Sequence, residues 1–283
     1  MMRLSVLCTT TDQKDLSKFK TMNIRSDVIF ANQCGRNETV TTSLEGHKVT
    51  LISTDTRGVG LNRNLALTAA DSEIVLFADD DMTYYDGYAE AVVRAFDEMP
   101  KADLLVFSVD YVKNGQIIKK RRNPVKRLRF WNSLKHGACV LAARRSALMR
   151  ARVCFSHLFG GGCIYGSGED SLFLLDCLRS GLRLYSHSFV LGACSKDSSS
   201  WFTGYHEKYF YDKGAWIAAA FPRTGALLRL YFSYQYRRLT DISMRQMRRL
   251  MRRGEKGYRT LLPWCEGCVS FETGSDSGKQ LPV

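Results

Sequence analysis

Short apolar segments alternate with segments of helical period through the first 110 residues of the chain. The pattern predicts buried β-strands at residues 4–8, 27–31, 49–53, 74–77 and 104–109. It predicts helices at residues 15–22, 61–70 and 85–99. Alternation of this kind is typical of an α/β fold with a mostly parallel sheet flanked by helices.

Polar side chains follow several of these strands at the point where each strand ends. They are Thr9 and Thr10, then Asn32 and Gln33, then Asp55, and finally Asp79, Asp80 and Asp81. Ligands of open α/β sheets bind beyond the carboxyl ends of the strands, so these residues are expected to share a ligand-binding rim.

The three consecutive aspartates are the most informative residues of that rim. Clustered carboxylates can hold Mg²⁺ or Mn²⁺, which prefer oxygen ligands and share them with phosphates. A solvated acidic turn is the alternative, and the tripeptide alone does not decide between them.

The second half of the chain is predicted to extend this domain and to end in a basic helical region. Asn114-Gly115 predicts a type I′ hairpin turn before the basic residues 119–129, which form either a solvated hairpin or a rim for an acceptor. A helix is expected from Ser167, a strand at 182–191 and a helix at 208–220. Residues 223–259 are helical in period, rich in arginine and interleaved with aromatic residues, which fits an anionic membrane interface.

The simplest division is therefore one catalytic domain followed by an extension. The domain spans residues 1–222, with a donor half at 1–110 and an acceptor half at 111–222. A basic amphipathic extension follows at 223–262, and residues 263–283 are expected to be a disordered tail.

The composition of the chain predicts what kind of partner the protein binds and in which compartment it lies. The formal net charge of +13 predicts an anionic partner, such as nucleotide phosphates, a lipid diphosphate, a membrane surface or nucleic acid. Nine scattered cysteines favour a reducing compartment, and the single CxxC pair, Cys265 and Cys268, lacks the further ligands of a zinc site. No apolar stretch is long enough to serve as a signal peptide or to span a bilayer, so a cytoplasmic protein is expected, with attachment to the cytoplasmic face of a membrane left open.

Three motifs in order carry a family resemblance. They are Gly58-Val-Gly-Leu-Asn-Arg-Asn64, Phe77-Ala-Asp-Asp-Asp81 and Gly166-Ser-Gly-Glu-Asp170. Together they make residues 1 to about 215 resemble a GT-A glycosyltransferase of family 2, of the bacterial polysaccharide type. The resemblance implies a GT-A fold, a nucleotide-sugar donor and a divalent cation, Mn²⁺ or Mg²⁺.

The resemblance also implies roles for the donor-side residues. Asp81 is expected to be the main metal ligand, with Asp79 beside it, while Asp79 and Asp80 are expected to contact the ribose or the sugar. The turn at Gly60 and the charge of Arg63 are expected to hold the nucleotide phosphates, because backbone amides at a helix start attract anions.

The base and ribose of the nucleotide are expected to lie against the first strands. Thr9, Thr10 and Gln33 close two of them, and Asp55 is either a reader of the base or a turn-capping residue. UDP is preferred over GDP, although no acidic residue stands at the strand ends where uracil is often read.

The acceptor hydroxyl must lose a proton, and Asp170 of the Glu169-Asp170 pair is the expected catalytic base of an inverting transfer. Capping of the helix is the alternative role for this carboxylate. His206 is a candidate metal ligand, with a packed loop histidine as the alternative, and His136 and Trp131 lie where acceptor contacts are expected.

The predicted function is metal-dependent transfer of a sugar to a glycan or lipid-linked acceptor in surface polysaccharide synthesis, at an anionic inner-membrane surface and without nucleic acid. A sugar nucleotidyltransferase would share the metal chemistry, but it needs a glycine-rich loop after the first strand, and residues 8–12 are no such loop. A non-catalytic membrane- or nucleic-acid-binding module would explain the charge and leave the aspartates unexplained.

Overall fold

The computed structural model describes residues 3–197, 204–261 and 263–264. They form two compact units, the first ending at Gly204 and the second starting at Tyr205.

The predicted domain boundary after residue 222 falls inside the second unit, between two helices. The CxxC pair and the predicted tail from residue 265 onward lie outside the described residues.

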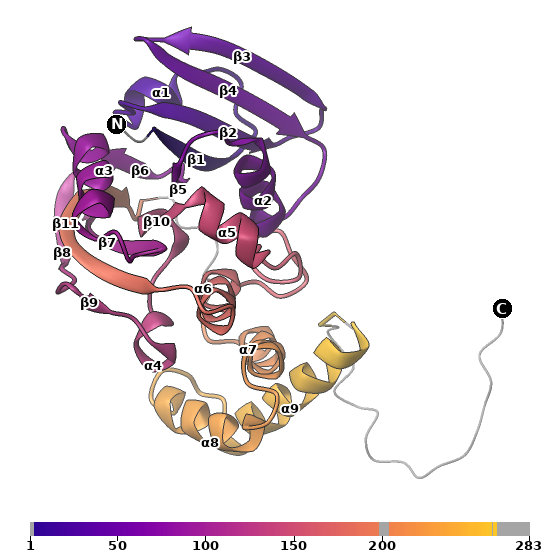
Figure 1. The fold of residues 1–283 in the computed structure, drawn as a ribbon. Coiled ribbons are helices and arrows are strands. Elements are labelled where there is room, and N and C mark those ends of the chain that lie inside the picture. The colour runs from indigo at the N-terminus through magenta and orange to yellow at the C-terminus, as the bar shows by residue number, and fades with distance from the viewer. Residues whose placement is uncertain (1–2, 198–203, 262, 265–283) are drawn as a thin grey trace. The chain divides into compact units, whose positions relative to one another are not determined.

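The first unit is built on one mixed sheet of 11 strands among the described residues (Figure 1). The strands are β1 (Leu4–Thr11), β2 (Asp27–Gln33), β3 (Glu38–Leu44), β4 (His47–Thr54), β5 (Ile74–Asp79), β6 (Met82–Tyr84), β7 (Leu104–Lys113), β8 (Gln116–Arg121), β9 (Lys126–Arg127), β10 (Leu141–Arg144) and β11 (Leu184–Ser195). Their order is β3-β4-β2-β1-β5-β10-β7-β11-β6, with β8 paired to β7 and β9 to β11. Strands β4, β2, β1 and β5 run parallel, and β10 enters the sheet antiparallel to both of its neighbours.

Helices flank this sheet. They are α1 (Lys18–Thr21), α2 (Val59–Ala69), α3 (Tyr88–Glu98), α4 (Phe130–Ser133), α5 (Arg145–Ala151) and α6 (Glu169–Arg179), with a short 3₁₀ turn η1 (Ala138–Val140). Helix α2 packs on β1 and β2, and α3 contacts β11. The predicted α/β class is confirmed, and the central strands β1, β2 and β5 supply much of the apolar core, as expected of parallel strands covered on both faces.

Six predicted strands correspond to β1, β2, β4, β5, β7 and β11, whereas β3, β6, β9 and β10 were not predicted. Strand β3 is almost wholly exposed at the sheet edge and consists largely of threonine, serine and glutamate, so it has no apolar run to mark it. The hairpin between β7 and β8 was predicted, and Asn114 and Gly115 both have the positive φ that a type I′ turn requires.

The second unit consists of helices α7 (Glu207–Ala220), α8 (Gly225–Tyr236) and α9 (Met244–Thr260). Helices α7 and α9 pack closely because glycines stand at their contact. A Cβ at Gly214 would overlap the backbone of Met251, and one at Gly254 would overlap the carbonyl of Tyr211. No described helix combines the length and the apolar character that a membrane crossing requires.

Candidate active site

A cavity of about 630 Å³ opens at the carboxyl ends of β1, β2 and β5. Its volume is in the range of small-molecule sites. Of the predicted site residues, the described residues that line it are Thr9, Thr10, Gln33, Arg63, Asp79, Asp80, Asp81, His136 and Asp170. The structure therefore brings the three sequence motifs to one place.

The parallel register of the sheet explains this convergence. Thr9 on β1 lies opposite Asp79 on β5, and its hydroxyl donates to Asp79 Oδ1 at 3.3 Å. On the other side of β1, Thr11 lies opposite Gln33 of β2. Since parallel strands end at the same edge, residues far apart in the chain meet there.

Arg63 connects the donor-side and acceptor-side motifs. Its guanidinium donates to Asp79 Oδ1 at 2.8 Å, to Asp170 Oδ1 at 2.9 Å and to Glu169 Oε1 at 3.1 Å. The arginine side chain is only 3% exposed, against 37%, 27% and 12% for Asp79, Asp170 and Glu169. A buried arginine thus sits beneath carboxylates that face the cavity.

The pKa of Arg63 shows that the nearby carboxylates outweigh the effect of burial on its guanidinium. Burial alone would lower the pKa of this guanidinium, but the nearby charges of Asp79, Asp170 and Glu169 raise it above its ordinary value. Arg63 therefore stays cationic, and its contacts in this structure are to carboxylates. A contact with the nucleotide phosphates stays a prediction.

Two asparagines fix the helix turn that carries Arg63. Asn62 donates to the carbonyl of Ala31 at 3.0 Å, and Asn64 exchanges two hydrogen bonds with the backbone of Phe155 at 2.8 and 2.9 Å. The ring of Phe155 also packs against the Arg63 guanidinium, 5.1 Å from the ring centroid. The Asn-Arg-Asn sequence therefore holds the arginine from both sides.

Asp170 lies in the first turn of α6, where helix amides favour a carboxylate. Burial and the neighbouring charge of Glu169 raise the pKa of Asp170 to about 7, although Arg63 opposes the shift. A carboxylate with a raised pKa accepts a proton readily near neutral pH, as a general base must.

Asp81 has the features expected of a cation ligand. Its Oδ1 is buried and has no hydrogen-bond partner in the described part of the chain, while Oδ2 accepts from the Cys194 thiol at 3.4 Å. Burial and the charge of Asp79 raise the pKa of Asp81 to about 6, which a bound cation would counteract.

The set of protein ligands for such a cation is small. No group of three or more His, Cys, Asp and Glu side chains in the described part of the chain is arranged to hold a metal. Mg²⁺ is often bound through one or two carboxylates together with substrate phosphates and water, so the residues present fit a cation that arrives with a diphosphate.

Asp80 differs from its two neighbours. It is exposed and pairs with Lys18 at 2.8 Å. Lys196 lines the cavity near Asp81 and packs over the ring of Tyr111. It supplies a positive charge that the sequence interpretation did not identify, because it follows a strand end with no recognisable motif.

Other predicted site residues have different positions. Gln33 Oε1 accepts from Gly58 N at 2.6 Å, so this side chain holds the loop before α2. Asp55 is exposed after β4, and neither it nor Gly60 is among the described residues that line the cavity. A Cβ at Gly60 would overlap the carbonyl of Ser156, so the structure gives this glycine a packing role.

His206 belongs to the second unit, where it caps the start of α7. Its Nδ1 accepts from the backbone N–H of Tyr209 at 3.4 Å. Its predicted role as a metal ligand stays a prediction.

The acceptor-side wall includes Lys135, His136 and Gly137. Nδ1 of His136 lies 2.9 Å from Arg121, and an arginine can only donate. Burial, together with the charges of Arg121 and Lys135, lowers the pKa of His136 to about 3, so the imidazole is neutral. Trp131 is exposed and is not among the described residues of this wall.

Comparison with known proteins gives a family match and a fold match. Residues 22–155 match the family described as Glycosyl transferase family 2. A search of curated proteins found no match.

Solved structures of S. aureus TarS share the fold. The complex of TarS residues 1–349 with UDP-GlcNAc has a TM-score of 0.59 at 16% identity over 92% of both chains. The complex of the same fragment with UDP has a TM-score of 0.58 at 17% identity, again over 92% of both chains. A longer TarS structure has a TM-score of 0.53 at 17% identity, covering 86% of this chain and 44% of TarS.

Proposed function

We propose that the chain is a glycosyltransferase of family 2 with the GT-A fold, which transfers a sugar from a UDP-sugar to an acceptor hydroxyl with inversion, assisted by a divalent cation. One observation carries the proposal. Arg63 joins Asp79, on the donor side, to Asp170, on the acceptor side, within one cavity. A transferase needs these two functions close together, because the leaving group departs as the acceptor attacks.

The donor binds along the ends of β1, β2 and β5. Thr9, Thr10 and Gln33 face the nucleoside, and Asp79 and Asp80 contact its ribose or the sugar. TarS, which shares the fold, has been crystallised with UDP and with UDP-GlcNAc, and this supports UDP as the nucleotide.

Asp81 would hold the cation, and its buried Oδ1, which has no hydrogen-bond partner among the described residues, supports this role. When bound, a divalent cation neutralises the charge that develops on the diphosphate as the glycosidic bond breaks. Lys196, which lies near Asp81, adds a second positive charge on the same side.

Asp170 takes the proton from the acceptor hydroxyl. The oxygen of that hydroxyl attacks the anomeric carbon from the side opposite the diphosphate, so the configuration inverts. Arg63 keeps the carboxylate of Asp170 in place and balances the negative charge of Asp79 and Glu169 beside it. Near pH 7 Asp170 can both accept the proton and release it afterwards.

The base assignment is tested by Asp170→Asn. This variant should keep UDP affinity and lose transfer by about 10²-fold or more, the usual contribution of a general base. Asp176→Asn is the matched control, because Asp176 lies on the same helix with a 48% exposed side chain and pairs only with nearby Arg179 among the described residues. Undiminished turnover by Asp170→Asn would refute the assignment.

The donor and the cation are tested together by thermal shift. UDP-GlcNAc and UDP should raise the Tm in the presence of Mn²⁺, and GDP should raise it less, since stabilisation follows occupancy. An NMR spectrum of the sugar first released from the α-linked donor should show the β anomer. The α anomer would contradict the inverting mechanism.

The acceptor is a glycan or lipid-linked sugar of a surface polysaccharide. This part of the proposal is supported by the family match and by the cationic residues of the second unit, which suit an enzyme bound peripherally at the cytoplasmic face of a membrane.

A further inference from the structure

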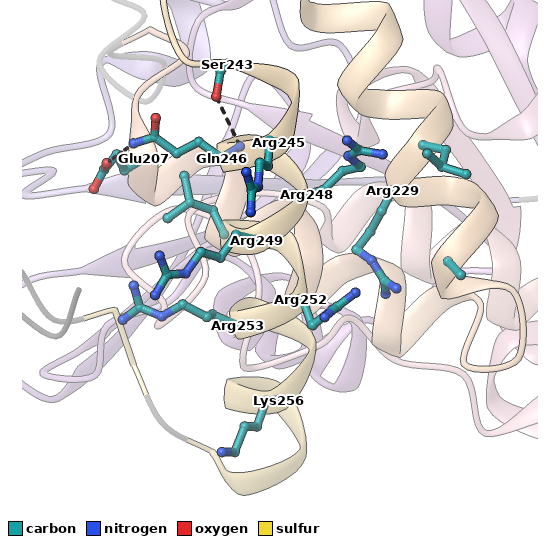
Figure 2. Close-up of a pocket in the computed structure, with 13 residues that line it drawn as sticks. Glu207, Arg229, Ser243, Arg245, Gln246, Arg248, Arg249, Arg252, Arg253 and Lys256 are labelled. Atoms are coloured by element: carbon teal, nitrogen blue, oxygen red, sulfur yellow. Dashed lines mark hydrogen bonds between the residues drawn. The ribbon is translucent and has the colours of Figure 1, made fainter. Parts of the chain in front are cut away.

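The second unit contains a groove of about 1010 Å³ between α8 and α9 that is lined by cationic side chains (Figure 2). We call it the arginine groove. Its basic members are Arg229, Arg245, Arg248, Arg249, Arg252, Arg253 and Lys256. Glu207 is the only carboxylate residue among the described residues of its lining. The groove is therefore a concentration of positive charge, and none of the proposed catalytic residues is among its lining residues.

Four of these cations form a stripe along α9. Arg245, Arg249, Arg252 and Lys256 recur at intervals of four, three and four residues, which places them on one helix face. No ion pair joins any of the four to a carboxylate elsewhere in the described part of the chain, whereas Arg229 across the groove pairs with Glu255.

All four side chains of the cation stripe are exposed, so core packing does not explain their recurrence. The opposite face of α9 carries Met247, Leu250 and Met251, which are buried. Like charges four residues apart on a helix destabilise it, so the stripe weakens α9 unless an anion lies against it. Its ends are eleven residues apart, or about 16 Å along the helix, which is long for a single phosphate.

An exposed apolar stripe on α8 adjoins this charge. Leu227, Leu230, Tyr231 and Tyr234 are 70%, 47%, 57% and 59% exposed, and their spacing also places them on one face. Leu230 lines the arginine groove as well, so the apolar stripe and the cationic groove meet. An exposed apolar stripe next to charge is typical of a binding surface.

The cation stripe of α9 and the apolar stripe of α8 together indicate which kind of partner binds. A nucleic acid or a soluble polyphosphate would neutralise the cations and leave the apolar side chains in water. An apolar protein groove would cover Leu227 and Tyr231 but not the arginines. An anionic bilayer satisfies both, because lipid phosphates pair with arginine while leucine and tyrosine enter the boundary between headgroups and acyl chains.

We propose that α8 and α9 form a docking face for an anionic phospholipid bilayer, with the apolar stripe inserted at the interface and the cation stripe on lipid phosphates. The inference deepens the proposed function, since a membrane would present the lipid-linked acceptor, but its test does not depend on catalysis.

The test is sedimentation of the full chain with large vesicles. At about 0.1 M salt the protein should bind vesicles of phosphatidylcholine with one third phosphatidylglycerol, and it should not bind phosphatidylcholine alone. Replacement of the four stripe cations by glutamine should weaken binding by about 100-fold or more, because each cation near an anionic surface contributes. The matched control replaces Lys14, Lys20, Arg94 and Lys101 by glutamine. These four residues are exposed on the first unit, so their substitution removes the same amount of positive charge from a different surface.

A second variant, Leu227→Ser with Tyr231→Ser, separates a membrane from a polyanion. It should reduce vesicle binding and leave binding of soluble polyphosphate unchanged. The proposal is overturned if the wild type does not bind anionic vesicles, if the control variant loses as much affinity as the stripe variant, or if the serine variant binds vesicles as the wild type does. Hydrolysis of UDP-GlcNAc should be equal in all these proteins, so a failure of docking is distinguishable from a failure of the proposed transferase function.

Discussion

Replacement of Arg63 by methionine tests the carboxylate bridge directly. The substitution keeps much of the side-chain volume against Phe155 and removes the cation that Asp79, Glu169 and Asp170 share. Removal of one partner from a buried ion pair costs about 3–5 kcal/mol. The carboxylates are partly solvated, so we expect the lower end, about 3 kcal/mol, which for a unit of this size lowers the Tm by about 6–12 °C.

The pH dependence of the stability lost in Arg63→Met shows whether the loss comes from the missing charge or from poorer packing against Phe155. Arg63 holds down the pKa of Asp170, which burial and Glu169 raise. Without Arg63, the folded-state pKa of Asp170 rises further above its unfolded value, so ionisation of Asp170 opposes folding. A carboxyl group whose pKa is higher in the folded protein than in the unfolded chain stabilises the fold at a pH below its unfolded pKa. This stabilisation is lost as the pH rises through the folded pKa. The difference in Tm between wild type and variant should therefore be largest near pH 8 and should narrow toward pH 5.

The assay is thermal unfolding of wild type, Arg63→Met, Arg63→Lys and Arg57→Met across this pH range. Arg57 is exposed, so its substitution should change little at any pH. Lysine restores one charge without the forked geometry of a guanidinium, so Arg63→Lys should recover part of the stability. A loss of equal size at every pH would show that packing on Phe155, and not the shared charge, accounts for the role of Arg63.

Three further predictions concern the site and the second unit. The kcat/KM for transfer should fall as the pH drops through about 7, because Asp170 must be deprotonated to act as base and burial has raised its pKa; a flat pH–rate profile would contradict this. Asp81→Asn should raise the Tm of the ligand-free protein, since it removes a carboxylate whose raised pKa disfavours folding at neutral pH, and it should abolish stabilisation by UDP with Mn²⁺. Gly254→Ala should push α9 away from Tyr211 and expose the second unit to limited proteolysis, while the Tm shift caused by UDP remains.

Much of the fold could be predicted because its central strands are buried on both faces. A strand such as β5 is an unbroken apolar run, and burial forces that composition on it. Edge strands face water and escape this constraint, so β3 and β8 could not be identified from apolar runs. The close crossing of α7 and α9 was also missed, because a glycine inside a helix has several explanations and the sequence does not say which backbone approaches it.

The sequence predicted which residues line the cavity better than it predicted which of them contact each other. The three motifs indicated Asp79, Arg63 and Asp170, and the cavity brings them together. The direct contact of Arg63 with both carboxylates depends on how α2, β5 and α6 approach each other, and spacing along the chain carries no signal for that. Lys196 was missed for the same reason, since a single lysine after a strand has no distinguishing pattern.

The aspartate tripeptide shows why neighbours in sequence can have separate roles. Asp79 contacts Arg63, Asp80 pairs with Lys18, and Asp81 accepts from Cys194. The turn between β5 and β6 directs the three side chains to different neighbours. The negative charge of each carboxylate is therefore balanced by its neighbours to a different extent. Asp79 faces a buried cation and Asp80 a half-buried one. Asp81 has a buried oxygen with no hydrogen-bond partner among the described residues, so it has the greatest electrostatic need for an added cation. The preference for Asp81 as metal ligand therefore follows from its neighbours as well as from the motif.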